Sequence, residues 1–194
     1  LAPGAGSTGF SALGEILNGS VNPSGKTADT YVKDLLSAHY INNIGNIPYT
    51  NVDDLKAQAL EADATYKGNI SFVNYVEGIY VGYKFCETAA EEGLIDYDSY
   101  VQYPFGYGLS YTTFEKTMTN FKDNGDTISF DVEVKNTGEV AGKDVVEIYY
   151  TPPYTNGGIE KSSVNLVQFE KTELLEPGKS QKISFEINKE DMAS

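Results

Sequence analysis

The second half of the chain alternates between apolar and polar residues. Within residues 127–135, single polar residues separate four apolar side chains: Ile128, Phe130, Val132 and Val134. Further strand-like runs occupy residues 146–150, 164–169 and 183–187, with turn-forming residues between them. Successive side chains of a strand point to opposite faces, so each run predicts a strand with one buried face. Strands at this spacing, without helical segments between them, predict an antiparallel β-sandwich.

The first half of the chain has a different pattern. Phe10, Leu13 and Leu17 fall on one face of a predicted helix, which Asn18-Gly19 ends. Four further elements are expected along this half: a short helix with a long loop (27–50), a polar helix (53–64), an aromatic and β-branched strand (72–83), and a helix that Gly93 stops (84–92).

The two halves meet at residues 103–114, which read YPFGYGLSYTTF and contain five aromatic side chains. Pro104 restricts its own φ and biases Tyr103 toward an extended conformation. Gly106 and Gly108 permit backbone angles that other residues resist. This combination predicts a tightly packed, irregular corner, because aromatic rings bury large areas and the glycines and proline shape the backbone.

The composition restricts the classes of partner. The chain has 194 residues, and its 14 lysines and arginines against 28 acidic residues give a net charge of −14. This balance opposes nucleic-acid binding, which depends on basic contacts to phosphates. A hydrophobic content of 40% is sufficient for a packed core. No apolar run approaches 18 residues, so the sequence predicts no membrane-spanning helix.

Three residues were considered for chemistry on their own. Cys86 is the only cysteine, so it cannot form an internal disulfide, and we expect a buried apolar side chain. His39 is the only histidine, which leaves too few ligands for a zinc site and favours an exposed or capping role. Lys26 follows a turn but lacks the spacing of a phosphate-binding loop. We therefore expect no metal and no cofactor.

Four stretches, taken together, point to one family. They are ALGEILNGSVNPSGK (12–26), YVEGIYVGYKF (75–85), YPFGYGLSYTTF (103–114) and VKNTGEVAGKDVVEIYY (134–150). The chain resembles glycoside hydrolase family 3, the β-glucosidase family, in which such stretches follow the same order. Residues 157–162 (GGIEKS) and the final EDMAS further resemble bacterial members in which the catalytic barrel follows these domains.

The resemblance implies an α+β fold in three parts. Residues 1–100 would be the C-terminal part of an α/β sandwich domain, residues 101–114 an aromatic junction, and residues 115–194 a fibronectin type III-like β-sandwich without its last strands. We therefore expect the chain to be a fragment of a longer protein. Its expected partner is the catalytic TIM-like barrel of that parent protein, through which a carbohydrate substrate would be bound.

The family hydrolyses β-linked sugars with retention, using a carboxylate nucleophile and a second carboxyl group as acid and base. Neither of the family's catalytic motifs is matched here, so the resemblance implies no catalytic residue in this chain. Three carboxylates were weighed and not assigned to catalysis. Asp96 is expected to be a loop acid, Glu15 a solvated helix residue, and Glu77 a buried, hydrogen-bonded anchor.

The expected role is therefore structural, as part of a retaining β-glycosidase, with β-glucosidase as the first expectation and the chain alone inactive. One alternative is a carbohydrate-binding module, since 15 tyrosines could stack on sugars, although tryptophan is absent. Another is a purely structural sandwich. Localisation is unassigned: no signal peptide is visible, and the sequons at Asn18 and Asn69 matter only in a glycosylating pathway.

Overall fold

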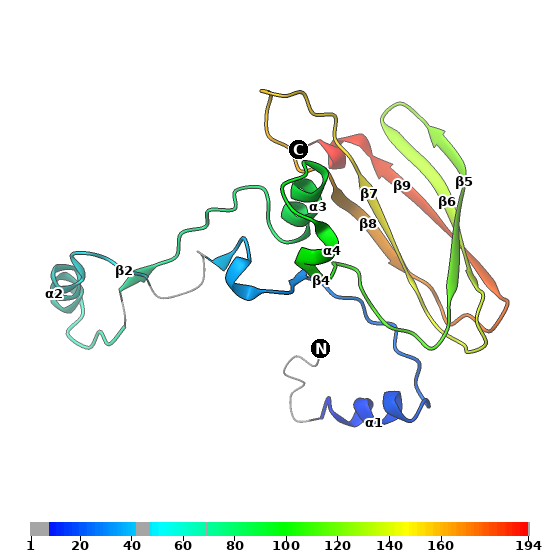
Figure 1. Ribbon diagram of the computed structural model, residues 1–194, viewed down its shortest axis with the longest axis horizontal. Coiled ribbons are helices and arrows are strands. Elements are labelled where there is room, and N and C mark those ends of the chain that lie inside the picture. Colours follow the sequence, from blue (N-terminus) through cyan, green and yellow to red (C-terminus); the bar gives the residue numbers. More distant parts are fainter. Residues whose placement is uncertain (1–7, 42–46, 69, 194) are drawn as a thin grey trace.

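The computed structural model describes residues 8–41, 47–68 and 70–193. Figure 1 shows a β-sandwich, helices α3 and α4 packed beside it, and an arm that carries α2 away from the sandwich. The first part contains α1 (Ser11–Leu17), β1 (Tyr31–Val32), η1 (Leu35–Ser37), β2 (Ile47–Pro48), α2 (Val52–Ala62), β3 (Ser71–Phe72), α3 (Tyr83–Glu91), α4 (Tyr97–Tyr100) and β4 (Val101–Tyr103). The second contains β5 (Phe114–Asp123), β6 (Thr127–Asn136), β7 (Val145–Tyr150), β8 (Asn165–Lys171), β9 (Ser180–Asn188) and η3 (Lys189–Met192).

The β-sandwich follows from the alternating pattern. Strands β5, β6 and β9 form one antiparallel sheet, and β7 pairs with β8 in a second. Phe130 lies opposite Phe185, and Val132 opposite Ile183, so the apolar residues of neighbouring strands share one face. They enclose the core between the sheets: Phe130, Val132, Val134, Val146, Leu175, Ile183, Phe185 and Ile187. The predicted strands and the α+β fold class are confirmed.

Strand β5 was not predicted from the sequence. Its alternation is interrupted by a register shift between Thr119 and Lys122, where Asn120 has a φ of 56°. Such an irregularity inserts residues that do not pair and thereby resets which side chains face the core. A fixed period of two therefore cannot follow this strand along its length.

The strand predicted at residues 72–83 is wrong. Only Ser71–Phe72 forms a strand, and α3 already begins at Tyr83. Gly78 and Gly82 adopt φ values of 59° and 60°, which turn the backbone out of an extended path. Apolar residues of this segment remain exposed, Tyr75 to 79%. Phe72 pairs with Ile47 of β2, but beyond Phe72 the aromatic and β-branched composition does not reflect pairing with another described strand.

The sequence predicted where helices α1 and α3 end, but it did not predict that the apolar face of α1 is exposed. Helix α1 ends at Asn18, followed by Gly19 with a φ of 81°, and α3 ends before Gly93, both as expected. The apolar face of α1 is exposed, however, since Phe10, Leu13 and Leu17 contact no described core. Among the described residues, no helix has the length and apolar character needed to cross a membrane.

The corner at residues 103–114 is packed only in part. The rings of Tyr103 and Tyr107 lie 5.0 Å apart, and the ring of Phe105 lies 4.9 Å from that of Tyr83. In contrast, Leu109 is 71% exposed and Tyr111 is half-exposed. The prediction of a tightly packed corner is therefore wrong at Leu109 and Tyr111, whereas Thr112 is buried and Phe114 packs against the sandwich core.

The side chain of Asn136 joins this corner to the sandwich. It is fully buried, and its Oδ1 accepts hydrogen bonds from Thr112 Oγ1 (2.6 Å) and the Gly138 N–H (3.1 Å). Its Nδ2 donates to the carbonyl oxygens of Val140 and Leu175, each at 2.8 Å. Both donor hydrogens and both acceptor positions of the amide are therefore used.

We predict that Asn136→Asp lowers the free energy of unfolding by about 2–4 kcal/mol at pH 7, measured by urea denaturation. The substitution puts a carboxylate oxygen against two carbonyl oxygens and removes both donated hydrogen bonds. The control Asn156→Asp lies in an exposed loop and should change the free energy by less than about 0.5 kcal/mol. Equal effects of the two substitutions would contradict this role of Asn136.

Candidate functional site

The region with the densest long-range polar contacts is the junction where residues 22–27 run along the corner. Thr27 is paired with the corner in both directions: its N–H donates to the Tyr107 carbonyl (2.8 Å), and its carbonyl accepts from the Gly106 N–H (2.9 Å). Its hydroxyl donates to the Pro104 carbonyl (2.6 Å) and accepts from the Tyr107 N–H (3.0 Å). These bonds hold the chain before β1 against the segment that follows β4.

Asn22 extends the junction to the sandwich. Its Oδ1 accepts hydrogen bonds from Ser110 Oγ (3.0 Å) and the Tyr111 N–H (2.8 Å). Its Nδ2 donates to the carbonyl oxygen of Ala141 (3.0 Å), in the loop between β6 and β7. One amide side chain thus connects three segments that are far apart in the sequence.

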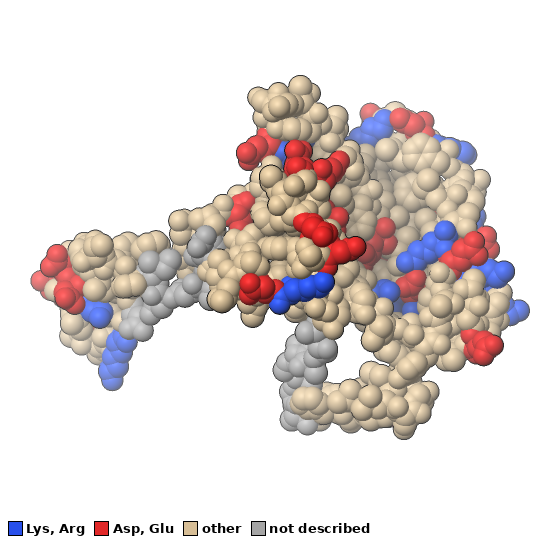
Figure 2. All heavy atoms as spheres, viewed as in Figure 1, with Lys and Arg blue, Asp and Glu red and all other residues tan. Residues whose placement is uncertain are grey.

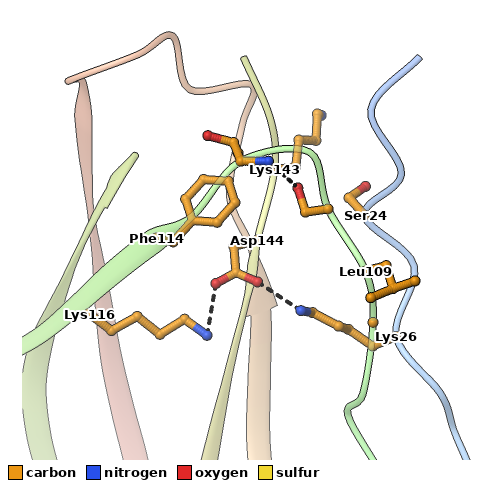
Figure 3. Close-up of a pocket in the computed structure, with 10 residues that line it drawn as sticks. Ser24, Lys26, Leu109, Phe114, Lys116, Lys143 and Asp144 are labelled. Carbon is orange, nitrogen blue, oxygen red and sulfur yellow. Dashed lines mark hydrogen bonds and ion pairs between the residues drawn. The ribbon is translucent and has the colours of Figure 1, made fainter. Parts of the chain in front are cut away.

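The charged centre of the junction is Asp144. Lys26 Nζ lies 3.1 Å from Asp144 Oδ1, and Lys116 Nζ lies 2.9 Å from Asp144 Oδ2 (Figure 3). The Asp144 side chain is only 9% exposed. Its backbone is also fixed, because Asp144 and Thr172 exchange two hydrogen bonds of 3.0 Å and 2.8 Å. The three charged residues line a pocket of about 530 Å³.

The electrostatics of Asp144 suit a structural role. Burial alone would raise its pKa, but hydrogen bonds from Lys116 and Lys26 outweigh the burial, and the pKa lies below that of an ordinary aspartate. A carboxylate held in this way is a poor proton donor at neutral pH. Asp144 is also the only carboxylate among the residues lining this pocket. The residues of this pocket therefore hold segments together around a single, ion-paired carboxylate.

Helix α3 supplies a second attachment to the sandwich. The Tyr83 hydroxyl accepts a hydrogen bond from the Leu166 N–H (2.9 Å) at the start of β8. The Tyr83 ring also lies edge-on to the Tyr149 ring, with 6.0 Å between their centroids. Further along α3, Thr88 Oγ1 accepts from the Ser163 N–H (3.0 Å). These contacts fix α3 against the β7–β8 sheet.

His39 is not exposed, which corrects the sequence-based expectation. Its side chain is 6% exposed and stacks on Phe85, with 4.3 Å between ring centroids. Its Nε2 lies 3.4 Å from Glu77 Oε1. Burial lowers the pKa of His39, and the Glu77 carboxylate opposes that shift only in part. The error arose because Phe85 is remote in the sequence and reaches His39 only through the tertiary fold.

The other residues considered earlier lie in separate places. Cys86 is fully buried on α3, as expected, and burial raises the pKa of its thiol to about 11. Glu15 is exposed on α1, and Asp96 is exposed in the loop before α4, also as expected. The Glu77 side chain is largely buried beside His39. Within the described residues, no group of three histidine, cysteine or acidic side chains could hold a metal ion. The second sequon begins at Asn69, outside the described residues.

Lys26 and Asp144 both lie in stretches that resemble the family, but no sequence pattern predicts that they meet at the junction. Lysine and aspartate in turn regions are usually solvated, so nothing local distinguishes them. The ion pair between Lys26 and Asp144 could have been predicted only by knowing that residues 22–27 lie beside the loop before β7.

Comparison with known proteins shows what the chain is similar to. Residues 144–194 match the fibronectin type III-like domain family. β-Glucosidase A of Butyrivibrio fibrisolvens is 35% identical over 97% of this chain, and a β-glucosidase of Ruminococcus albus is 33% identical over 97%. The structure of β-glucosidase 3B from Thermotoga neapolitana in complex with glucose matches 93% of this chain with a TM-score of 0.71 and 33% identity. A GH3 β-glucosidase from Bifidobacterium adolescentis matches 94% with a TM-score of 0.68 and 28% identity.

In sequence and fold, the chain matches a segment of β-glucosidases, among them a glycoside hydrolase family 3 enzyme. It spans only 21% and 16% of the length of the B. fibrisolvens and R. albus relatives, and 21% of the T. neapolitana protein. The resemblance noted in the sequence is thereby confirmed. The described junction lies inside the matched part of these glycoside hydrolases.

We predict that Gly108→Ala lowers the free energy of unfolding by about 1–3 kcal/mol, measured by urea denaturation. A Cβ at Gly108 would overlap the backbone carbonyl of Gly25, which cannot rotate away as a side chain could. Gly25→Ala is the matched control, since a Cβ there meets nothing within 4 Å. It should change the free energy by less than about 0.5 kcal/mol or stabilise the chain slightly. Equal effects of the two substitutions would contradict the specific close approach of residue 108 to the Gly25 carbonyl.

We also predict a pH-dependent contribution from Asp144. Because its pKa is lowered in the folded chain, the ion pairs stabilise the fold above the unfolded pKa of about 4 and are lost as the pH falls through the folded value. Asp144→Asn should therefore lower the free energy of unfolding by about 1–2 kcal/mol at pH 7. The difference from the parent chain should shrink in denaturation experiments below about pH 4.

The control for this pH experiment is Asp126→Asn, which removes an exposed carboxylate without a side-chain hydrogen bond or ion pair among the described residues. It should leave the free energy within about 0.5 kcal/mol at both pH values. A constant difference for Asp144→Asn from pH 7 to pH 3 would contradict the ion-pair argument.

Proposed function

We propose that the chain is a structural part of a retaining β-glycosidase, and specifically of a β-glucosidase that hydrolyses β-linked glucosides or oligosaccharides. The supporting observation is that β-glucosidases from several organisms match nearly the whole chain in both sequence and fold. The Asp144 junction supports a structural role, because its carboxylate is neutralised by two lysines. Both catalytic carboxyls of the parent enzyme would then lie outside these 194 residues.

The proposed partner of this chain is the remainder of the parent enzyme, including a TIM-like catalytic barrel. Two segments present apolar side chains to solvent: the α1 face, and residues 73–81. In the view of Figure 2, the segment carrying α1 is almost entirely uncharged. Contiguous exposed apolar surface of this kind marks an interface. We propose that the rest of an α/β domain in the parent enzyme covers α1 and residues 73–81. In that arrangement the sandwich would lie beside the catalytic barrel.

The proposed domain division is residues 1–100, 101–114 and 115–194, with the β-sandwich incomplete. A largely apolar groove of about 440 Å³ opens between β5 and β7. Met118 is 60% and Phe121 58% exposed there, although Met118 pairs with Val132 and Phe121 stacks on Phe130 on the core side of the sheet. Among the described strands, β7 pairs only with β8. A further strand of the parent protein beside β7 would cover these side chains.

The proposal predicts that the purified chain does not hydrolyse p-nitrophenyl β-glucoside, whereas mixing it with the separately produced remainder of its parent restores hydrolysis. Ile79→Asp should reduce the restored activity at least about tenfold, because it places a charge in the proposed apolar interface. Leu174→Asp is the control, since Leu174 is equally an exposed apolar residue but lies on a sandwich loop.

Two results would overturn this proposal. The first is turnover by the chain alone that is abolished by replacing one of its own acidic residues. The second is reconstituted activity that tolerates Ile79→Asp as well as Leu174→Asp.

A further inference from the structure

A second groove, separate from the Asp144 junction, lies between α3 and the long loop that joins β7 to β8. Its volume is about 750 Å³, within the range of pockets that hold small organic ligands. The floor is fixed by hydrogen bonds: the Ser163 N–H and hydroxyl contact Thr88 Oγ1 at 3.0 Å and 3.3 Å. Beside it, the buried Ser162 hydroxyl donates to Asn165 Oδ1 (2.7 Å). The groove is therefore built on an ordered base.

Two tyrosines belong to the lining of the groove. Tyr80 comes from the segment before α3, and Tyr154 comes from the β7–β8 loop, where it is 50% exposed. Burial, then the nearby Glu160, Tyr154 and Glu92, raise the pKa of the Tyr80 phenol. At neutral pH the hydroxyl therefore keeps its proton and can donate a hydrogen bond. Tyr154 offers an aromatic surface that the protein itself does not cover.

Four polar side chains of the lining are uncommitted. The side chains of Glu91, Glu92, Asn156 and Lys161 form no hydrogen bond or ion pair with another described residue. The Asp144 pocket differs, because its only carboxylate is already paired with Lys26 and Lys116, and the β5–β7 groove differs because its lining is largely apolar. The α3 groove thus combines an open aromatic ring with free donors and acceptors.

This combination favours a neutral polyol. A sugar ring has an apolar face of C–H groups that can lie on an aromatic ring, and its hydroxyls both donate and accept hydrogen bonds. Acidic side chains gather over α3 and α4 in the view of Figure 2, so a phosphate or other anion would be repelled. Carboxylates accept hydrogen bonds from sugar hydroxyls, while the Asn156 amide and Lys161 can donate to them.

We propose that the groove between α3 and the β7–β8 loop binds a short β-linked gluco-oligosaccharide, with one sugar ring on Tyr154 and hydroxyls contacting Glu92 and Asn156. The neutral-polyol chemistry rests on the groove, and the choice of β-linked glucose rests on the function proposed above. Such a site would hold part of an oligosaccharide on the structural domains of the parent enzyme, away from the Asp144 junction.

The test is a titration of the ¹⁵N-labelled 194-residue chain with cellotriose, followed by amide chemical shifts. Saturable shifts are expected in residues 88–92 and 154–163. Tyr154→Ala should weaken binding about tenfold, whereas Tyr154→Phe, which keeps the ring, should bind within about twofold of the unmodified chain. Glu92→Gln should weaken binding several-fold by removing a charged acceptor. Tyr75→Ala replaces a more exposed tyrosine outside the groove and should leave binding unchanged.

The absence of saturable shifts, or binding that Tyr154→Ala leaves unchanged, would overturn the proposal. If Tyr154→Phe still binds cellotriose, substitution at this loop position does not itself disrupt folding. The loss of binding in Tyr154→Ala can then be attributed to the missing ring. Hydrolysis is measured separately on the parent enzyme. If the parent enzyme hydrolyses β-glucosides but the groove does not bind cellotriose, only the proposed binding site is wrong. If the chain binds cellotriose but its parent has no β-glucosidase activity, the proposed function is wrong.

Discussion

The buried amide of Asn136 is the interaction on which the rest of the structure depends. It connects the corner before β5, the loop after β6 and the turn before β9 through four hydrogen bonds. An amide can satisfy this site because it offers two donors and two acceptor positions at fixed angles. Any apolar replacement would leave buried carbonyl oxygens without a donor, which costs more than the core packing gains. The sandwich core supplies the hydrophobic free energy, whereas Asn136 determines how the loops close around it.

The remaining contacts attach the first part of the chain to that closed sandwich. Asn22 and Thr27 hold the segment before β1, and Asp144 forms ion pairs with Lys26 from that segment and Lys116 from β5. Helix α3 is attached independently through Tyr83 and Thr88. Two attachments at separate points limit rotation between the parts. The attachments therefore fix the first part of the chain relative to the sandwich. The apolar side chains of α1 and of residues 73–81 remain exposed in the described chain.

The sequence predicted those features whose causes are local. Alternation located β6, β7, β8 and β9, and glycines located the ends of α1 and α3. It missed β5 because the irregularity at Asn120 resets the alternation. It placed a strand at residues 72–83 because aromatic and β-branched residues also occur in exposed segments that pack against other surfaces. Of the candidate site, Lys26 and Asp144 lay in recognised stretches, but their pairing depends on a contact between distant segments.

By itself, the sequence determined the antiparallel sandwich, the core residues of β6 and β9, the burial of Cys86 and the resemblance to glycoside hydrolase family 3. These follow from periodicity, side-chain polarity and motif order, which are properties of neighbouring residues. Only the tertiary structure decided that His39 is buried against Phe85, that Asn136 joins three loops, that Asp144 binds two lysines, and that Tyr80 and Tyr154 line one groove. Each of these depends on which distant segments become neighbours, and burial and hydrogen bonding change with that neighbourhood.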